Sequence, residues 1–189
     1  MKKIMFNDTH NLTQAVLTGE KTMTRRLLTD NVPLGNWEET AKHLPYKVGE
    51  VVAIAQSYKS IANDRDEAET VLDLYKIGDN YLTMDEMGAG WNNKMFVKAG
   101  LLPHHIRITD VKVERLQDIS DEDILREGVW QFYDNKKVFH IYKNTRETTS
   151  TICFLSAREA FEYLIDKVSG KGTWDSNPLV VVYSFKLLD

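Results

Sequence analysis

The chain has 189 residues, 42% of them hydrophobic, which is enough to bury one good core. Its 24 basic and 28 acidic residues give a formal net charge of -4. That balance argues against a protein that holds long nucleic acid by bulk electrostatics. The single cysteine, Cys153, rules out a disulfide framework within the chain and a zinc site built from cysteines.

Targeting and membrane signals are weak in this sequence. The apolar stretch Ile4–Phe6 is too short for a signal peptide, and the longest apolar runs have the length of strands. We therefore expect a soluble, cytoplasmic protein that contacts no membrane. Because no Pro/Gly/Ser-rich linker divides the sequence, we expect one domain over residues 1–189.

The first predicted helix ends in an unusual polar run. Asn11 is a suitable N-cap for this short amphipathic helix, and Gly19 suits its left-handed end. Residues 19–26 then read Gly-Glu-Lys-Thr-Met-Thr-Arg-Arg, which places one amine, two hydroxyls and two guanidinium groups beside the helix end. From residue types alone, an ordinary solvated loop is the favoured interpretation, because charge runs usually face water.

Strand signals follow in the middle of the chain. The apolar run Val51–Ala55 predicts a buried strand, and residues 71–82 predict a hairpin with its turn at residues 78–80. The clearest strand is His105–Leu116. Its apolar parity changes between Ile108 and Val111, which indicates a bulge near residues 109–110.

Two later helices carry their own start signals. Ser120 with Asp123, and Ser156 with Glu159, have the spacing of capping boxes. A last strand is predicted from Leu179 to Phe185. The order of predicted helices and strands gives an α+β fold, which suits a small barrel with helices packed on its rim.

The octapeptide also resembles a family signature. Gly19, Lys21, Thr24 and Arg26 match the pattern Gly-x-Lys-x-x-Thr-x-Arg of ASCH domains, which belong to the PUA-like superfamily of small β-barrels. Three further segments fit the family in order, namely 46–52, 119–129 and 174–185, although Glu50 stands where Asp is commoner. The last segment is similar to the closing strand of the larger, phage-associated members.

The resemblance implies a PUA-like barrel with two insertions, around residues 59–104 and 130–155, because compact members are much shorter. Both insertions are rich in aromatic residues. Such residues usually form the apolar side of added hairpins, but beside a pocket they can stack a nucleic-acid base. Trp91 and Trp174 are the best candidates for contact with a ligand.

The resemblance further implies an activity, because some compact members are amidohydrolases that remove the acetyl group of N4-acetylcytidine. By that likeness Lys21 is the base, Thr24 the nucleophile and Glu127 the proton donor. Arg25 and Arg26 are expected to bind substrate, with Arg25 facing solvent or phosphate. The expected ligand is a small modified nucleoside or RNA, with no cofactor.

The residue types have a chemical rationale of their own. A threonine hydroxyl needs a base to become a nucleophile, and a lysine can serve only if burial or nearby cations lower its pKa. Lys21 and Thr24, three residues apart, would share one side in a turn. Glu127 lies at a predicted helix end, where partial negative charge favours the protonated acid. An exposed Glu127 that merely pairs with a cation is the alternative.

Two other function classes stay open. The first is a non-catalytic PUA-like module that binds RNA or a modified nucleoside through the same cleft, and the second is a phage-derived accessory protein that contacts another protein. A metal site is not expected, because His104 and His105 would point to opposite faces of a strand and the other histidines are scattered. The oligomeric state is left undetermined.

Overall fold

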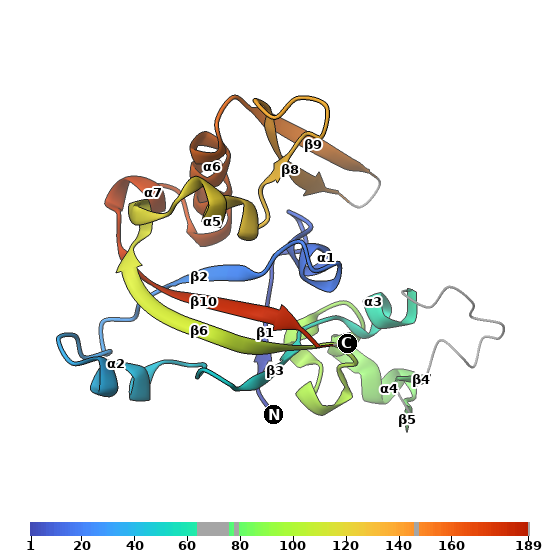
Figure 1. The fold of residues 1–189 in the computed structure, drawn as a ribbon. Coiled ribbons are helices and arrows are strands. Elements are labelled where there is room, and N and C mark those ends of the chain that lie inside the picture. Colours follow the sequence, from blue (N-terminus) through green and yellow to red (C-terminus); the bar gives the residue numbers. More distant parts are fainter. Residues whose placement is uncertain (64–75, 78–79, 146–147, 189) are drawn as a thin grey trace. The chain divides into compact units, whose positions relative to one another are not determined.

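The structure is a computed structural model that describes residues 1–63, 76–77, 80–145 and 148–188 (Figure 1). The chain divides into two compact units, which are described separately. The first consists of Met1–Phe6, Val51–Ile106 and Leu188–Asp189, and the second of Asn7–Glu50 and Arg107–Leu187. The single domain over residues 1–189 and its two insertions stay a prediction.

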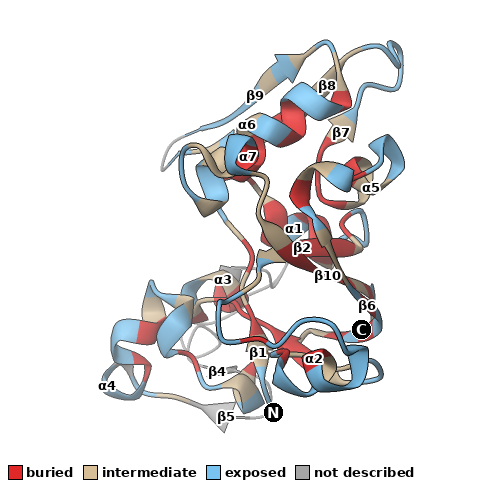
Figure 2. Ribbon diagram, turned by 90° about the vertical axis from the view of Figure 1, so that its left-hand side faces the viewer, coloured by how far each residue is buried: buried red, intermediate tan, exposed pale blue. Residues whose placement is uncertain are grey.

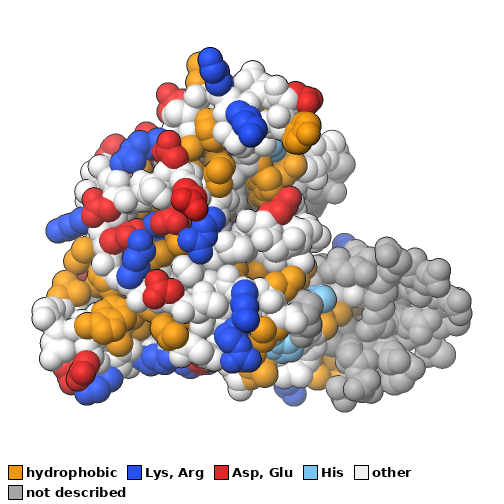
Figure 3. Space-filling model, in the orientation of Figure 1, with side chains coloured by type: hydrophobic (Ala, Val, Ile, Leu, Met, Phe, Trp, Pro, Cys, Tyr) orange, Lys and Arg blue, Asp and Glu red, His pale blue; other side chains and the backbone are white. Residues whose placement is uncertain are grey.

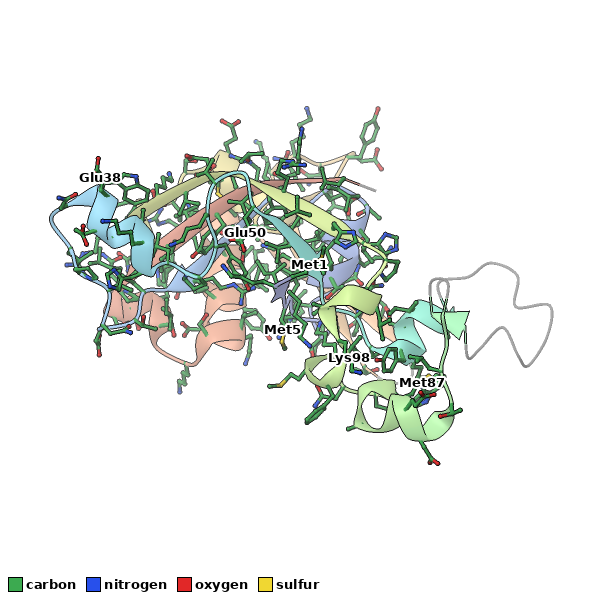
Figure 4. All side chains as sticks on the ribbon, turned by 90° about the horizontal axis from the view of Figure 1, so that it is seen from below. Met1, Met5, Glu38, Glu50, Met87 and Lys98 are labelled. Carbon is green, nitrogen blue, oxygen red and sulfur yellow. The ribbon has the colours of Figure 1, made fainter. Side chains whose placement is uncertain are left out.

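The first unit consists of short elements. Its strands and helices are β1 (Lys3–Ile4), β3 (Val51–Ile54), α3 (Tyr58–Asn63), β4 (Lys76–Ile77), β5 (Asn80–Tyr81), α4 (Met84–Met87), η2 (Gly88–Trp91), η3 (Lys94–Phe96) and η4 (Ala99–Leu101). Met87, labelled in Figure 4, is buried in a small apolar core with Tyr58 and Leu102. Gly90 lies so close to the Tyr58 ring that an added Cβ would stand 2.7 Å from it, so this core also depends on a missing side chain.

The second unit contains the longer elements. They are α1 (Leu12–Leu17), β2 (Met23–Leu27), α2 (Trp37–His43), η5 (Leu116–Asp118), α5 (Asp121–Arg126), β7 (Trp130–Gln131), β8 (Phe139–Asn144), β9 (Thr149–Phe154), α6 (Ala157–Ser169), α7 (Thr173–Ser176) and β10 (Leu179–Leu187). Strand β6 (His105–Arg115) begins in the first unit and continues in the second. Figure 2 shows that β2 is largely buried, whereas α6 is buried on one side only.

The described strands form three sheets. Hydrogen bonding gives the order β1-β3-β6-β10-β2 in the largest, β4-β5 in the second and β7-β8-β9 in the third. In the second unit β2 runs antiparallel to β10, with Thr24 opposite Tyr183 and Arg25 opposite Val182. The α+β class is confirmed, but no closed barrel is found among the strands that the structure describes.

Several predicted helix boundaries are confirmed by their caps. The Ser120 side chain accepts a hydrogen bond from the Asp123 backbone N–H at the start of α5, and Ser156 does the same for Glu159 at the start of α6. Asn11 precedes α1 but makes no side-chain cap there. In α2 it is Asn36 that caps the backbone N–H of Glu38, which is labelled in Figure 4.

The strand predictions are confirmed where the structure describes them. In β6 the buried positions shift phase from Ile106 and Ile108 to Val111, as the parity change indicated. Of the predicted hairpin, the structure describes the short antiparallel pair β4–β5, while residues 71–75 and 78–79 lie outside the described residues. Within the described part of the chain, no helix is long and apolar enough to cross a membrane.

Candidate functional site

Lys21 is fixed by backbone hydrogen bonds that its own N–H and the N–H of Thr22 make. Gly19 takes a left-handed conformation (φ 76°) that turns the chain after α1, as its position predicted. The Lys21 N–H then donates to the Ala15 carbonyl at 2.8 Å, and the Thr22 N–H donates to the Arg126 carbonyl at 3.0 Å. These bonds hold the start of the octapeptide between α1 and the end of α5.

The amine of Lys21 is buried against Glu127. Only 2% of Lys21 is exposed, and its Nζ donates to the Glu127 carboxylate oxygen Oε2 at 2.8 Å. The same Nζ donates to the Glu127 backbone carbonyl at 2.6 Å. The structure thus brings together two residues that lie 106 positions apart and that the sequence singled out for base and acid roles.

Glu127 reaches this position because α5 ends there. It is the C-cap of α5, as the sequence predicted, and Gly128 follows with φ 96°. A Cβ at Gly128 would stand 2.7 Å from Leu12 Cδ2 and 3.6 Å from Lys21 Cδ. A glycine is therefore required for two reasons, the positive φ and the close approach of α1 and Lys21.

Arg25 binds the other side of the Glu127 carboxylate. Its Nη1 donates to Glu127 Oε1 at 3.1 Å, and its Nε and Nη2 donate to Glu114 Oε1 at 3.1 and 2.6 Å. Nη2 also reaches Asp123 Oδ2 at 3.2 Å. The Arg25 side chain is fully buried, so the expectation that it faces solvent is wrong, while its contact with phosphate or substrate stays a prediction.

Two more cations border this cluster. Lys112 Nζ lies 2.7 Å from Glu114 Oε2, and Arg126 Nη1 lies 3.2 Å from Asp123 Oδ1. Figure 3 shows acidic and basic side chains next to one another on this face of the second unit. The result is an alternating network in which each carboxylate touches at least two cations, which offsets much of the cost of burial.

The environment tunes two of these groups. Burial lowers the pKa of Lys21, the Glu127 carboxylate opposes that shift, and Arg26 and Arg25 reinforce it. Burial alone would raise the pKa of Glu114, but hydrogen bonds from Lys112 and Arg25 outweigh that effect, so the pKa is lowered. The amine therefore loses its proton more easily than an exposed lysine does.

Thr24 does not lie where the spacing argument put it. Residues 23–27 form strand β2 and not a turn, and side chains alternate along a strand. Thr24 and Arg26 therefore point to the face of β2 opposite Arg25. Thr24 is buried, and among the described residues no hydrogen bond joins its hydroxyl to Lys21 or Glu127. Its role as nucleophile stays a prediction.

Neither tryptophan that the sequence favoured is an open platform. Trp174 is 7% exposed and packs edge-on against Phe161, with 6.1 Å between ring centres. The Arg158 guanidinium lies over its ring, 4.9 Å from the ring centre. Trp91 belongs to the first unit and packs partly buried against that unit's apolar core. Their predicted contact with substrate is not tested by these positions, but Trp174 offers little free ring surface.

Sequence reasoning missed Glu114 and Asp123 as partners of Arg25. Glu114 lies 89 positions from Arg25, and no local pattern links a strand carboxylate to a guanidinium that far away. Asp123 had been noted only for its backbone role at the start of α5. Within the described ranges, no group of three or more His, Cys, Asp or Glu side chains is arranged to hold a metal ion. A metal-free site nevertheless stays an expectation.

Comparison with known proteins gives one distant likeness. No family model matches the chain, and no curated protein matches it either. Among solved structures, the chain is similar to the crystal structure of an ASCH domain from Lactobacillus crispatus JV V101, with 13% identity and a TM-score of 0.37. The likeness covers 96% of this chain and 75% of that one. It is to the family that the octapeptide resembles, but it is too distant to carry an argument about activity.

Proposed function

We propose that this protein is a metal-free amidohydrolase that acts on an N4-acylated cytidine or a similar modified nucleoside. The observation that carries the proposal is the buried contact of 2.8 Å between Lys21 Nζ and Glu127 Oε2. An amine and a carboxyl group in direct contact can exchange one proton. Transfer from Lys21 to Glu127 leaves a neutral base and a protonated acid side by side, which are the two states that amide cleavage needs.

The reaction we propose has two balanced steps. In the first, the Thr24 hydroxyl oxygen adds to the acyl carbon as Lys21 takes its proton, and Glu127 protonates the leaving N4 as the C–N bond breaks. In the second, water adds to the acyl-threonine ester, gives a proton to Glu127 and releases the carboxylic acid. Lys21 returns its proton to Thr24, which restores all three groups.

Thr24 is the part of this scheme that the geometry supports least, because it points to the other face of β2. A water molecule activated by Lys21 is the alternative nucleophile. We keep Arg26 as a proposed substrate contact, and the PUA-like barrel and a cytoplasmic location as parts of the same proposal. Arg25 is proposed to position Glu127 through the 3.1 Å bond to Oε1.

The alternative of a binding module that uses the same residues is less well supported. Lys21, Arg25 and Arg26 would be its phosphate contacts, but Lys21 and Arg25 are buried and already paired with carboxylates. A phosphate would have to displace Glu127 or Glu114 from them, and the displaced carboxylates would repel it. Amide chemistry on a small neutral group needs no such displacement.

Release of cytidine from N4-acetylcytidine by the purified protein tests the proposal. We expect Lys21→Met, which keeps the apolar stem, and Glu127→Gln to lower kcat/KM by about 100-fold or more. Lys42→Met removes an exposed lysine on α2 and should change nothing. An inactive wild-type protein, or a Lys21→Met variant as active as wild type, would refute the proposal.

The variant Thr24→Ala separates the two nucleophiles. A loss of activity equal to that of Lys21→Met supports Thr24, and retained activity assigns the attack to water. Thermal unfolding of each variant shows whether a loss of activity reflects the chemistry or a loss of the folded state, because removal of one partner of a buried ion pair is itself destabilising.

A further inference from the structure

An aromatic cluster lies on one face of the three-stranded sheet β7-β8-β9. Paired residues in neighbouring strands share a face, and the register pairs Trp130 with His140 and His140 with Cys153. Tyr142, two residues beyond His140, lies on this face as well. The opposite face is covered by α6, where Phe154 packs against Tyr163 with 5.5 Å between ring centres.

The rings of the exposed face are close together and partly open. Around His140, the ring centres of Trp130, Phe132 and Tyr142 lie at 6.1, 4.4 and 5.3 Å. Trp130 and Tyr142 are half-buried, and Phe132 is 39% exposed. We refer to Trp130, Phe132, His140 and Tyr142 as the aromatic platform.

Within this platform, His140 contributes a polar atom that lacks a partner. His140 is 7% exposed, and its Nδ1 has no hydrogen-bond partner among the described residues. Burial lowers the pKa of His140, which keeps the imidazole neutral near pH 7. A neutral ring nitrogen can donate to or accept from a ligand, and a buried polar atom without a partner is costly unless something satisfies it.

The charge around the platform suits a polyanion. Between Trp130 and Phe154 the described residues include three exposed lysines, Lys136, Lys137 and Lys143, against one carboxylate, that of Asp134. This hairpin is therefore locally basic on a chain whose net charge is -4. Aromatic rings on an open sheet face with lysines at its rim are the combination that binds single-stranded nucleic acid, where bases stack and phosphates pair with cations.

The platform also adjoins the proposed catalytic groups. The Trp130 Nε1 donates to Glu20 Oε2 at 3.2 Å, and Glu20 directly precedes Lys21. A Cβ built on Gly128 would stand 3.6 Å from Lys21 Cδ and 4.0 Å from the Trp130 ring. All these residues belong to the second unit.

From these contacts we infer that the aromatic platform binds the bases of a single-stranded nucleic acid, with Lys136 and Lys137, in the turn between β7 and β8, facing its phosphates. This site is distinct from the Lys21–Glu127 pair, and its binding does not depend on hydrolysis. A strand held here places one of its bases next to the proposed catalytic pair.

The test is fluorescence anisotropy with labelled eight-nucleotide oligocytidylate, as RNA and as DNA, against the same sequence in a duplex and against free cytidine as competitor. We expect Trp130→Leu to weaken binding about tenfold and Trp130→Phe, which keeps an aromatic ring, to stay near wild type. The matched control is Trp37→Leu, because Trp37 is 49% exposed on α2 and should not matter. Lys136→Gln with Lys137→Gln should reduce the salt dependence, whereas Lys42→Gln on α2 should not.

A second measurement locates the bound oligonucleotide without any substitution in the aromatic platform. Cys153 is exposed, it is the only cysteine of the chain and it pairs with His140 in the sheet. Bound oligonucleotide should slow its alkylation by iodoacetamide. Preference for RNA over DNA assigns RNA as the ligand, and equal binding assigns single strands of either kind.

Several results would overturn the inference. They are no binding of single strands by wild type, equal binding of the duplex, free cytidine as tight a ligand as the oligonucleotide, unchanged affinity in Trp130→Leu, and unprotected Cys153. The variant Glu127→Gln keeps this test apart from the proposed hydrolysis, because we expect it to lose activity and still bind the oligonucleotide.

Discussion

At the scale of single residues, the site is defined by a carboxylate that pairs with two cations at once. Glu127 accepts from Lys21 through one carboxylate oxygen and from Arg25 through the other. The Glu127 carboxylate favours the protonated amine of Lys21, and removing Glu127 would leave a buried amine without its carboxylate.

Tyr183, which lies opposite Thr24 in the sheet, carries a prediction of its own. Burial raises the pKa of Tyr183 to about 12, against 10.0 for an exposed tyrosine. Between these two values the unfolded chain has lost the proton and the native state keeps it, so this group makes stability fall as pH rises through the window. The difference of about two units corresponds to about 3 kcal/mol at most.

We expect Tyr183→Phe to remove the fall in stability at high pH that Tyr183 causes. Urea unfolding at pH 8 and pH 11 gives the free energy of unfolding at each pH, and this free energy should fall less between the two in the variant than in wild type. The comparison cancels the contributions of other groups that titrate at high pH. Equal losses in both proteins would show that Tyr183 ionises as readily in the native state as in the unfolded chain.

At the scale of elements, the site depends on where α1, β2 and α5 end and begin. The sequence predicted the ends of α1 and α5 because glycines and capping residues act over three or four positions. It did not predict the extended conformation of residues 23–27, which is set by pairing with β10, more than 150 positions away. The spacing argument for Lys21 and Thr24 failed for that reason, since the same three-residue interval means opposite things in a turn and in a strand.

Gly128 is the point where α5 meets α1 and Lys21. We expect Gly128→Ala to destabilise the fold by about 1–3 kcal/mol, because alanine disfavours φ 96° and its Cβ would meet Leu12. Gly100→Ala is the matched control, since a Cβ there has nothing within 4 Å. Chemical unfolding of both variants measures the difference, and equal stability of the two would contradict this explanation of the glycine.

At the scale of the whole molecule, the sequence predicted the α+β class and most element positions, but not the network that joins them. Cap residues and apolar periodicity are local, so α5, α6, β6 and β10 could be found without a structure. The ion pairs of Arg25 with Glu114, and of Lys21 with Glu127, join segments about 90 to 110 positions apart. No periodicity reports such pairs, and only the family resemblance pointed to Glu127.

For the same reason, the sequence could not predict which tryptophans are exposed to a ligand. Composition marked the segment 130–155 as aromatic-rich but could not say which rings face a helix and which face outward. Sheet register decides that, because it sets Trp130 on the face of His140 and leaves Phe154 against α6. Trp174, favoured from the sequence, is enclosed by Phe161 and Arg158.

The proposed chemistry depends most on the buried amine of Lys21, which gives up its proton more readily than an exposed lysine does. Nitrogen-15 NMR of the Lys21 side chain, followed against pH, measures this directly. We expect the Lys21 pKa to lie below the ordinary value of about 10.4 and to fall further in Glu127→Gln, because the carboxylate favours the protonated amine. A Lys21 pKa at or above 10.4 that does not respond to Glu127→Gln would contradict the account.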